Sequence, residues 1–405
     1  MQQLSRKLET NLKTLDGMFG TSADYYAKKI MIYHCRGCIV LFDGMASLNS
    51  LWALVLDGAS RQAPPQSGAN AQLTGEQVYA LILQDSAFPA ESSPVEDLPD
   101  LVKRLTAGMA VLLLDGCAKG IAFMAVNDGD INDYIFNRKV SDNALPLIVI
   151  PTTCGTGSEG NGFGVLTNPK TGDKKSLRCN AIVPKVSIVD PGVMGTMPPH
   201  VLASVGFDAL CHNIEAYTSK TAQPFTDALA HYAVTLLAQH LVPLYKHVKA
   251  AAEGKPAVLN EKQLTKAWEA VTLASTMGGM VINTAGVTLA HGMEHPASGL
   301  KDITHGVGLA VIEPVAVEYT WSANPDKFGA LARIFNHGDG SELGEALRLI
   351  VHDLDLTTNL TELGFTKKDI PWLVDNVYVV ATGNIANTVA KISRKDIEAL
   401  YKKMF

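Results

Sequence analysis

The chain has 405 residues, of which 47% are hydrophobic and 18% charged, and it carries a formal net charge of −6. These values are typical of a globular protein with enough residues for two domains. They argue against a basic surface for nucleic acid, so we expect no nucleic-acid partner.

The sequence carries no targeting or membrane signal. The first residues, MQQLSRKLETNLKTLDGMF, lack the apolar core of a secretory signal, and no apolar run approaches about 18 residues. Six cysteines are too few for a disulfide framework. We therefore predict a cytoplasmic protein without a membrane span.

The first half of the chain mixes helix and strand patterns. Residues 1–30 have leucines at helical spacing, and residues 30–45 resemble two strands around the tripeptide CRG. Further on, LPLIVIPTT (145–153) predicts a short buried strand that opens into a Gly/Thr loop, and VSIVDP (186–191) predicts another strand.

From Pro198 onward the patterns are helical, separated by short breaks. We therefore predict an α/β domain over 1–195, followed by an all-α domain over 196–405. The expected helices cover 199–219, 223–247, 261–279, 287–296, 305–320, 325–335, 341–353, 367–379 and 393–404.

Two compact motifs in the helical half carry metal-ligand side chains. In DALCH, Asp208 and His212 are four residues apart, so they share one face of a helix and can bind the same ion. HGMEHPASGLKDITH adds His291 and His305. One carboxylate and three imidazoles suit Fe²⁺ or Zn²⁺ better than Mg²⁺ or Ca²⁺.

Several blocks resemble one known family over about 119–405. PTTCGTGSE (151–159) is similar to its PTTxGTGSE, and PKVSIVDP (184–191) to its PxVxxxDP. GFDALCHNIEAY (206–217) is similar to its GxDAxxHxxE, and the stretch from His291 to its HxMxHxxG…PHG, with Thr304 in place of the proline. The chain resembles the iron-containing (group III) alcohol dehydrogenases, which implies their dehydroquinate synthase-like architecture.

The resemblance implies a role for particular residues. It makes Asp208, His212, His291 and His305 the metal ligands. It places His295 near the substrate as a proton-transfer residue, although its spacing from His291 equally permits a role in orienting that ligand. Lys174 would contact the nucleotide ribose. The cofactor loop would use Thr152, Thr153, Gly155, Thr156, Gly157 and Ser158.

The resemblance also implies an activity. The metal would polarise the oxygen of a small alcohol or aldehyde while hydride passes to or from NAD or NADP. The protein would be a metal-dependent alcohol dehydrogenase or aldehyde reductase, assembled as a homo-oligomer of two or more copies.

The cofactor half departs from the family pattern. Relatives carry GGGSxxDxAK, whose glycines let the backbone approach a pyrophosphate. Here the aligned segment is AVLLLDGCAKGIA (110–122), in which apolar residues replace those glycines. This stretch resembles a buried strand.

Residues 1–125 resemble instead the N-terminal domain of spore germinant-receptor A subunits. The similar stretches are FGTSAD (19–24), IVLFDGMAS (39–47) and LTAGMAVLLLDGCAKGIAF (105–123). We expect a fusion, with a germinant-receptor-like segment over 1–118. The alternative is a diverged dinucleotide-binding segment, in which Asp43 would lie near the adenosine ribose.

Two functions therefore remain open from the sequence. The first is the dehydrogenase. The second is a catalytically impaired fusion protein with a sensory or binding role related to spore germination, which keeps the metal site but lacks the Gly-rich loop.

Overall fold

The computed structural model describes residues 17, 127 and 139, the strands at 25–32 and 35–42, and the segments 131–135, 141–168 and 170–405. The chain divides into two compact units, Met1–Asp128 and Gly129–Phe405. The aligned segment 110–122, Asp43 and most of the predicted germinant-receptor-like segment lie outside the described residues.

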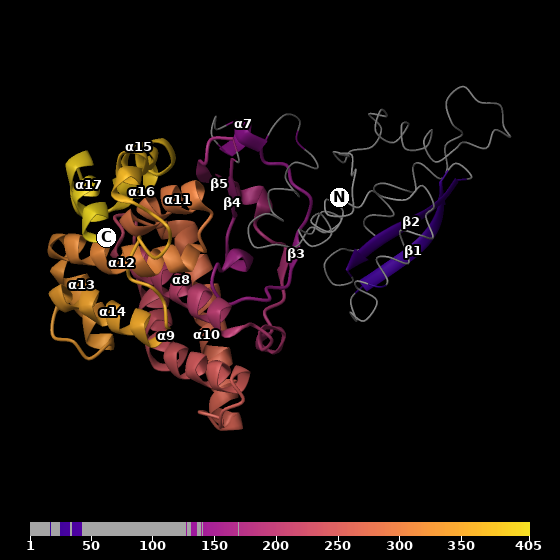
Figure 1. Cartoon of the computed structure of the whole chain (residues 1–405), viewed down its shortest axis with the longest axis horizontal. Coiled ribbons are helices and arrows are strands. Elements are labelled where there is room, and N and C mark those ends of the chain that lie inside the picture. Colours follow the sequence, from indigo (N-terminus) through magenta and orange to yellow (C-terminus); the bar gives the residue numbers. More distant parts are fainter. Residues whose placement is uncertain are drawn as a thin grey trace. The chain divides into compact units, whose positions relative to one another are not determined.

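The described part of the first unit is an antiparallel hairpin. Strand β1 (Tyr25–Ile32) pairs with β2 (Cys35–Phe42), and Ile32 is opposite Cys35 (Figure 1). Two strands were expected over 30–45, with CRG between them. In the structure CRG lies within β2, which begins at Cys35.

The second unit begins with short elements. Helix α7 (Ile131–Ile135) precedes the parallel pair of β3 (Ile148–Val149) and β6 (Val186–Ser187). Between them in sequence, β4 (Phe163–Thr167) and β5 (Lys174–Arg178) form an antiparallel hairpin that the sequence did not predict.

The expected strand over 145–153 forms only in part, and it is not buried. Ile148 is 62% exposed and Ile150 is 48% exposed. The reason is that β3 pairs only with β6 among the described strands, and a pair of two-residue strands leaves its side chains uncovered.

Every helix predicted after residue 198 is present. Three of them, α9, α10 and α11, extend five or six residues beyond their predicted ends, and α16 was missed. The helices are α8 (Pro199–Thr218), α9 (Pro224–Ala252), α10 (Glu261–Ala285), α11 (Leu289–Lys301), α12 (His305–Thr320), α13 (Pro325–Ile334), α14 (Leu343–Asp353), α15 (Ile370–Val380), α16 (Thr382–Asn387) and α17 (Arg394–Lys403).

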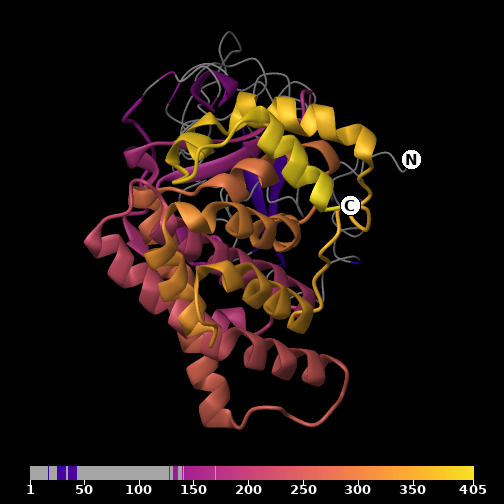
Figure 2. The same cartoon turned by 90° about the vertical axis from the view of Figure 1, so that its left-hand side faces the viewer.

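Helix α8 is the centre of this helical region. It packs against α9, α10 and α12, and the turn between α9 and α10 lies at the opposite end from α15 and α17 in both views (Figures 1 and 2). Phe207, Leu210 and Ile214 of α8 are fully buried or nearly so, as are the polar residues Asp208 and Glu215. Charged groups buried this deeply need compensating partners, so α8 is where a functional site is expected.

Hydrogen-bonded caps begin several of these helices. Asn260 and Gln263 cap each other's backbone N–H groups at the start of α10, and Ser393 and Asp396 do the same at α17. Within the described residues no single helix is long and apolar enough to cross a membrane, although α10 and α11, bent by 103°, pass that test together.

Candidate metal centre

Three helices bring the four predicted ligands together. Asp208 and His212 lie one turn apart on α8, and His291 lies on the first turn of α11. Helix α11 ends at Lys301, and the left-handed backbone of Asp302 (φ 52°) turns the chain so that His305 becomes the first residue of α12. Thr304, where relatives have proline, occupies the N-cap position of α12 without a side-chain cap hydrogen bond, and His305 still lies in the cluster.

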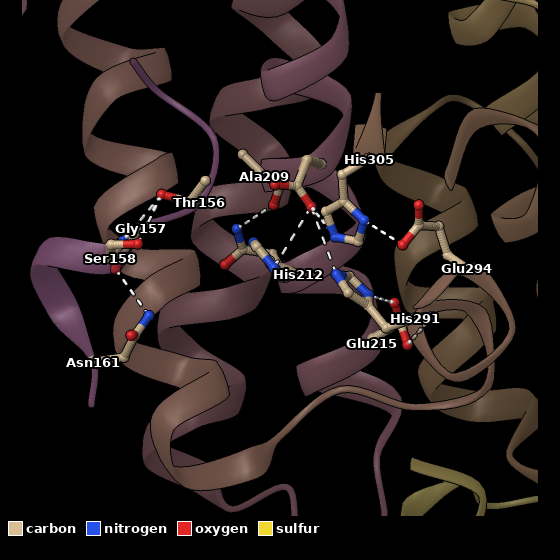
Figure 3. A network of polar contacts seen from close by, with 12 residues as sticks. Thr156, Gly157, Ser158, Asn161, Ala209, His212, Glu215, His291, Glu294 and His305 are labelled. Atoms are coloured by element: carbon tan, nitrogen blue, oxygen red, sulfur yellow. Dashed lines mark hydrogen bonds and ion pairs between the residues drawn. The ribbon is translucent and has the colours of Figure 1, made fainter. Parts of the chain in front are cut away.

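The three imidazoles converge on one carboxylate oxygen. Oδ1 of Asp208 lies 3.6 Å from Nε2 of His212, 3.6 Å from Nε2 of His291 and 3.7 Å from Nε2 of His305. Figure 3 shows the rings of His212, His291 and His305 turned toward one another. Two ligand atoms bound tetrahedrally at about 2.1 Å lie roughly 3.4 Å apart, so this spacing matches a shared ion.

The cluster fits a divalent cation. Asp208 is 3% exposed, and neither its Oδ1 nor Nε2 of His291 has a hydrogen-bond partner. Leaving a buried carboxylate oxygen and a buried imidazole nitrogen unpaired costs free energy. A cation among these atoms would remove that cost, and carboxylate and imidazole ligands together suit iron or zinc.

The pKa values of two of these histidines also indicate that a positive charge is favoured in the cluster. Burial lowers the pKa of His212 to about 4, which leaves its ring neutral. Burial opposes the charge on His291 as well, yet Glu215 and Asp208 raise its pKa to about 10. The two carboxylates therefore stabilise a positive charge at this ring, and a metal ion bound at Nε2 would supply it.

Two buried glutamates hold the outer nitrogens of the ligand rings. Glu215 Oε1 contacts Nδ1 of His291, and Glu294 Oε2 contacts Nδ1 of His305 (Figure 3). Glu215 is fixed in turn by the backbone N–H of Thr288 at 2.5 Å and by its hydroxyl at 2.9 Å. A carboxylate on Nδ1 directs Nε2 toward the metal.

Sequence reasoning missed both glutamates as functional residues. Each follows a predicted ligand by three residues, since Glu215 comes after His212 and Glu294 after His291. The signal was present, because a carboxylate at this spacing on a buried helix must find a buried partner.

His295 lies beside the cluster. Its ring centroid is 6.1 Å from that of His291 and 5.7 Å from that of His305. Burial and the charge of Lys174 lower its pKa well below the ordinary value. The two nitrogens of His291 face other groups, Glu215 at Nδ1 and Asp208 at Nε2.

The loop 151–159 is anchored to the helices that carry the cluster. A Cβ on Gly155 would lie 2.5 Å from Cβ of Val205 on α8, and one on Gly157 would lie 2.4 Å from the backbone nitrogen of Gly279 on α10. Both glycines are buried, so they are needed for close packing. Val205 lies three residues before Asp208 on α8, so this helix connects the loop to the metal cluster.

The hydroxyl side of this loop is accessible. Thr152 is exposed, whereas Thr153, Thr156 and Ser158 are partly exposed. The hydroxyls of Thr156 and Ser158 are 3.1 Å apart (Figure 3). Lys174 lies elsewhere, on β5, where its Nζ is 4.0 Å from Glu294 Oε2.

Comparisons with known proteins identify the family. The model described as "Fe-containing alcohol dehydrogenase family, C-terminal" matches residues 202–405, and that described as "Iron-containing alcohol dehydrogenase" matches residues 114–191. The chain belongs to the iron-containing alcohol dehydrogenase family.

Relatives with this family's activities are similar over most of their length. The chain is 33% identical over 297 residues to 1,3-propanediol dehydrogenase of Citrobacter freundii, covering 71% of this chain and 73% of that protein. It is 32% identical over 269 residues to the NAD-dependent methanol dehydrogenase of Bacillus methanolicus, covering 64% of this chain and 67% of that protein.

Solved structures agree. A 1,3-propanediol oxidoreductase has a TM-score of 0.62 at 31% identity, covering 72% of this chain and 74% of that chain. ADH/D1, an archaeal alcohol dehydrogenase from a Red Sea brine pool, has a TM-score of 0.64 at 28% identity, covering 74% and 75%. These findings confirm the alcohol dehydrogenase prediction over the non-catalytic alternative. They do not support a germinant-receptor fusion.

Proposed function

We propose that this iron-containing alcohol dehydrogenase holds a divalent metal between Asp208, His212, His291 and His305 and interconverts small alcohols and aldehydes. The observation that supports it best is the convergence of three imidazole nitrogens on Asp208 Oδ1, within 3.6–3.7 Å. The carboxylate and imidazole ligand set suits iron or zinc, and the match to the iron-containing alcohol dehydrogenase family favours iron.

A divalent ion in this position supplies Lewis-acid polarisation of the substrate oxygen, and a nicotinamide cofactor supplies or accepts the hydride. Asp208 is the only anion among the four proposed ligands. The set therefore leaves part of a divalent charge uncompensated, and this favours an alcohol oxygen from which the proton is leaving.

His295 is the proposed proton carrier. Its low pKa keeps the ring neutral, so it can accept the proton of an alcohol, and it can return the proton when an aldehyde is reduced. Its position 5.7 Å from the ring of His305 supports this role.

The loop 151–159 is proposed to hold the cofactor through its accessible hydroxyls, which belong to Thr152, Thr153, Thr156 and Ser158. Gly155 and Gly157 contribute by letting the loop lie against α8 and α10. NAD is favoured over NADP, because one relative is named as NAD-dependent and the structure of a sulfoacetaldehyde reductase at 27% identity is a complex with NAD+.

Small primary alcohols form the proposed substrate class, since relatives are named for 1,3-propanediol and methanol. The test is calorimetric titration of metal-loaded protein with NADH and NADPH, followed by assays with 1,3-propanediol, methanol and their aldehydes. NADH binding in the micromolar range with turnover of one panel member is expected. Absence of binding by both nucleotides would refute the proposal.

His295→Gln separates metal binding from proton transfer. The variant should retain its metal and bind NADH, while kcat falls by about 10²-fold or more because the carrier is lost. An unchanged kcat and pH profile would exclude His295 from proton transfer.

Three further proposals, the fusion, the homo-oligomer and the cytoplasmic location, rest on the sequence. The fusion with a segment over 1–118 rests on the quoted stretches, and the family match at 114–191 begins near its end. A homo-oligomer and a cytoplasmic location follow from the resemblance and the composition. Light scattering after size-exclusion chromatography tests the first of these two.

A further inference from the structure

Lys174 is held against the helix that carries His291. A Cβ on Gly299 of α11 would lie 1.9 Å from the carbonyl oxygen of Gly172, so the chain just before β5 abuts the end of α11. On the other side, Asp173 Oδ1 accepts a hydrogen bond from Asn376 Nδ2 of α15 at 2.5 Å. Lys174 follows directly, and its side chain is 16% exposed.

The group that Lys174 reaches is a buried carboxylate. Glu294 has a fully buried side chain, and its Oε2 lies 4.0 Å from Nζ of Lys174. The same oxygen touches Nδ1 of His305 without an aligned hydrogen bond. Among the described residues, Lys174 is the permanent cation next to this oxygen, and a carboxylate buried without such a charge is strongly destabilising.

His305 depends on Glu294 more than the other rings depend on their neighbours. Its side chain is 28% exposed, compared with 8% for His212 and 3% for His291. It also lies at the first residue of a helix, directly after a turn. Packing therefore restrains this ring least, and a partner on Nδ1 has the largest part in orienting it.

We propose that Lys174 is a positioning residue of the metal centre, which acts through Glu294 to hold the ring of His305. Lys174 balances the buried charge of Glu294 and keeps Oε2 against Nδ1 of His305. The proposal rests on the proposed metal site. It gives Lys174 a role distinct from the ribose contact that the family resemblance implies.

The test compares three variants of the full-length protein loaded with Co²⁺ or Zn²⁺. Lys174→Met removes the charge and keeps the length, Lys174→Arg keeps the charge, and Lys175→Met is the matched control, because Nζ of Lys175 points to the carbonyl oxygen of Val379 instead. The measurements are the rate of metal loss to a chelator, the Co²⁺ absorption spectrum and NADH affinity.

We expect Lys174→Met to lower metal affinity by about tenfold, which is the lower end of the range for residues that support metal ligands. We also expect a changed Co²⁺ spectrum. Lys174→Arg and Lys175→Met should match the wild type in metal affinity and in the Co²⁺ spectrum. Weaker NADH binding with unchanged metal affinity and spectrum would overturn the proposal. Equal metal loss in all three variants would also overturn it, because charge at position 174 would then not be the cause.

A double-mutant cycle checks the route. In a Glu294→Gln background, Lys174→Met should change metal affinity by less than about twofold, because the carboxylate that it acts on is gone. A full effect in that background would overturn the proposed route. If the wild type binds no metal, the proposed function fails as well, whereas a wild type that binds metal and a Lys174→Met variant that binds it equally refute this inference alone.

Discussion

Oδ1 of Asp208 lies 3.6 Å from Nε2 of His291, although the two residues belong to different helices, α8 and α11. Neither atom has a hydrogen-bond partner, and both are buried. Two unpaired buried polar atoms at this separation are explained by a cation between them. A metal ion at the proposed site would therefore help to stabilise the contact between these helices.

Asp208→Asn should abolish tight metal binding. The amide keeps the size of the side chain but removes the one negative charge of the proposed ligand set, so metal affinity should fall by at least about 100-fold, with a parallel loss of activity. Metal content after dialysis, measured by mass spectrometry, checks this. Asp190→Asn is the control, because Asp190 is exposed and only caps a turn through Gly192. Retained metal in Asp208→Asn would exclude Asp208 as a ligand.

Glu215→Gln should weaken metal binding less severely. Gln can still accept from Thr288, but it presents a neutral group to Nδ1 of His291, so metal affinity should fall by about 10- to 100-fold. Competition with a chromogenic chelator measures the change. The exposed Glu269 on the neighbouring helix α10 supplies the control Glu269→Gln, and equal affinity in both variants would contradict an orienting role.

Glu313→Gln should become more stable than the wild type as pH rises. Glu313 is 1% exposed, and burial together with the charge of Glu215 raises its pKa well above the ordinary value. The unfolded chain ionises at about pH 4.3, so above that pH the wild type loses up to about 1.4 kcal/mol of stability per pH unit until the folded pKa is reached. The Gln variant lacks this loss.

Urea unfolding of both metal-loaded proteins from pH 5 to pH 8 measures that difference. The free energy of unfolding of Glu313→Gln minus that of the wild type should increase across this range. Glu313→Ala should be less stable than Glu313→Gln, because it leaves a cavity and no donor for Glu215. A difference that does not change with pH would mean that Glu313 ionises normally in the folded protein.

Gly279→Ala should separate the loop 151–159 from α10. The added Cβ would lie 1.8 Å from the carbonyl oxygen of Gly157, so backbone must move at a cost of about 1–3 kcal/mol. The KM for the nicotinamide cofactor should rise more than that for the alcohol. Gly383→Ala is the control, since nothing lies within 4 Å of its Cβ and it should be neutral or stabilising by up to about 1 kcal/mol. Equal KM values for the cofactor in both variants would exclude a role of the loop in cofactor binding.

Much of the helical fold was predictable from local patterns, and the exceptions have physical causes. Helix α16 (Thr382–Asn387) was missed because TGNIAN contains weak helix formers and is too short to show a period. The β4–β5 hairpin was missed because KKSLR is largely polar, and it becomes a strand by pairing with FGVLT and lying against α11.

Local sequence patterns likewise predicted only part of the candidate site. The spacing of Asp208 and His212 predicts their shared helical face, because it is a local property of helix geometry. Family resemblance, and not spacing, joined them to His291 and His305. Glu215 and Glu294 each follow a predicted ligand by three residues, but only the tertiary structure shows that they contact His291 and His305.

The sequence by itself determined most of the helices after residue 198, the shared helical face of Asp208 and His212, and the family to which the chain belongs. Only the tertiary structure decided which groups balance one another inside the protein: Glu215 with His291, Glu294 with His305, and Lys174 with Glu294. The reason is that helix periodicity depends on neighbours three and four residues away, whereas a buried charge depends on whatever distant segments bring beside it.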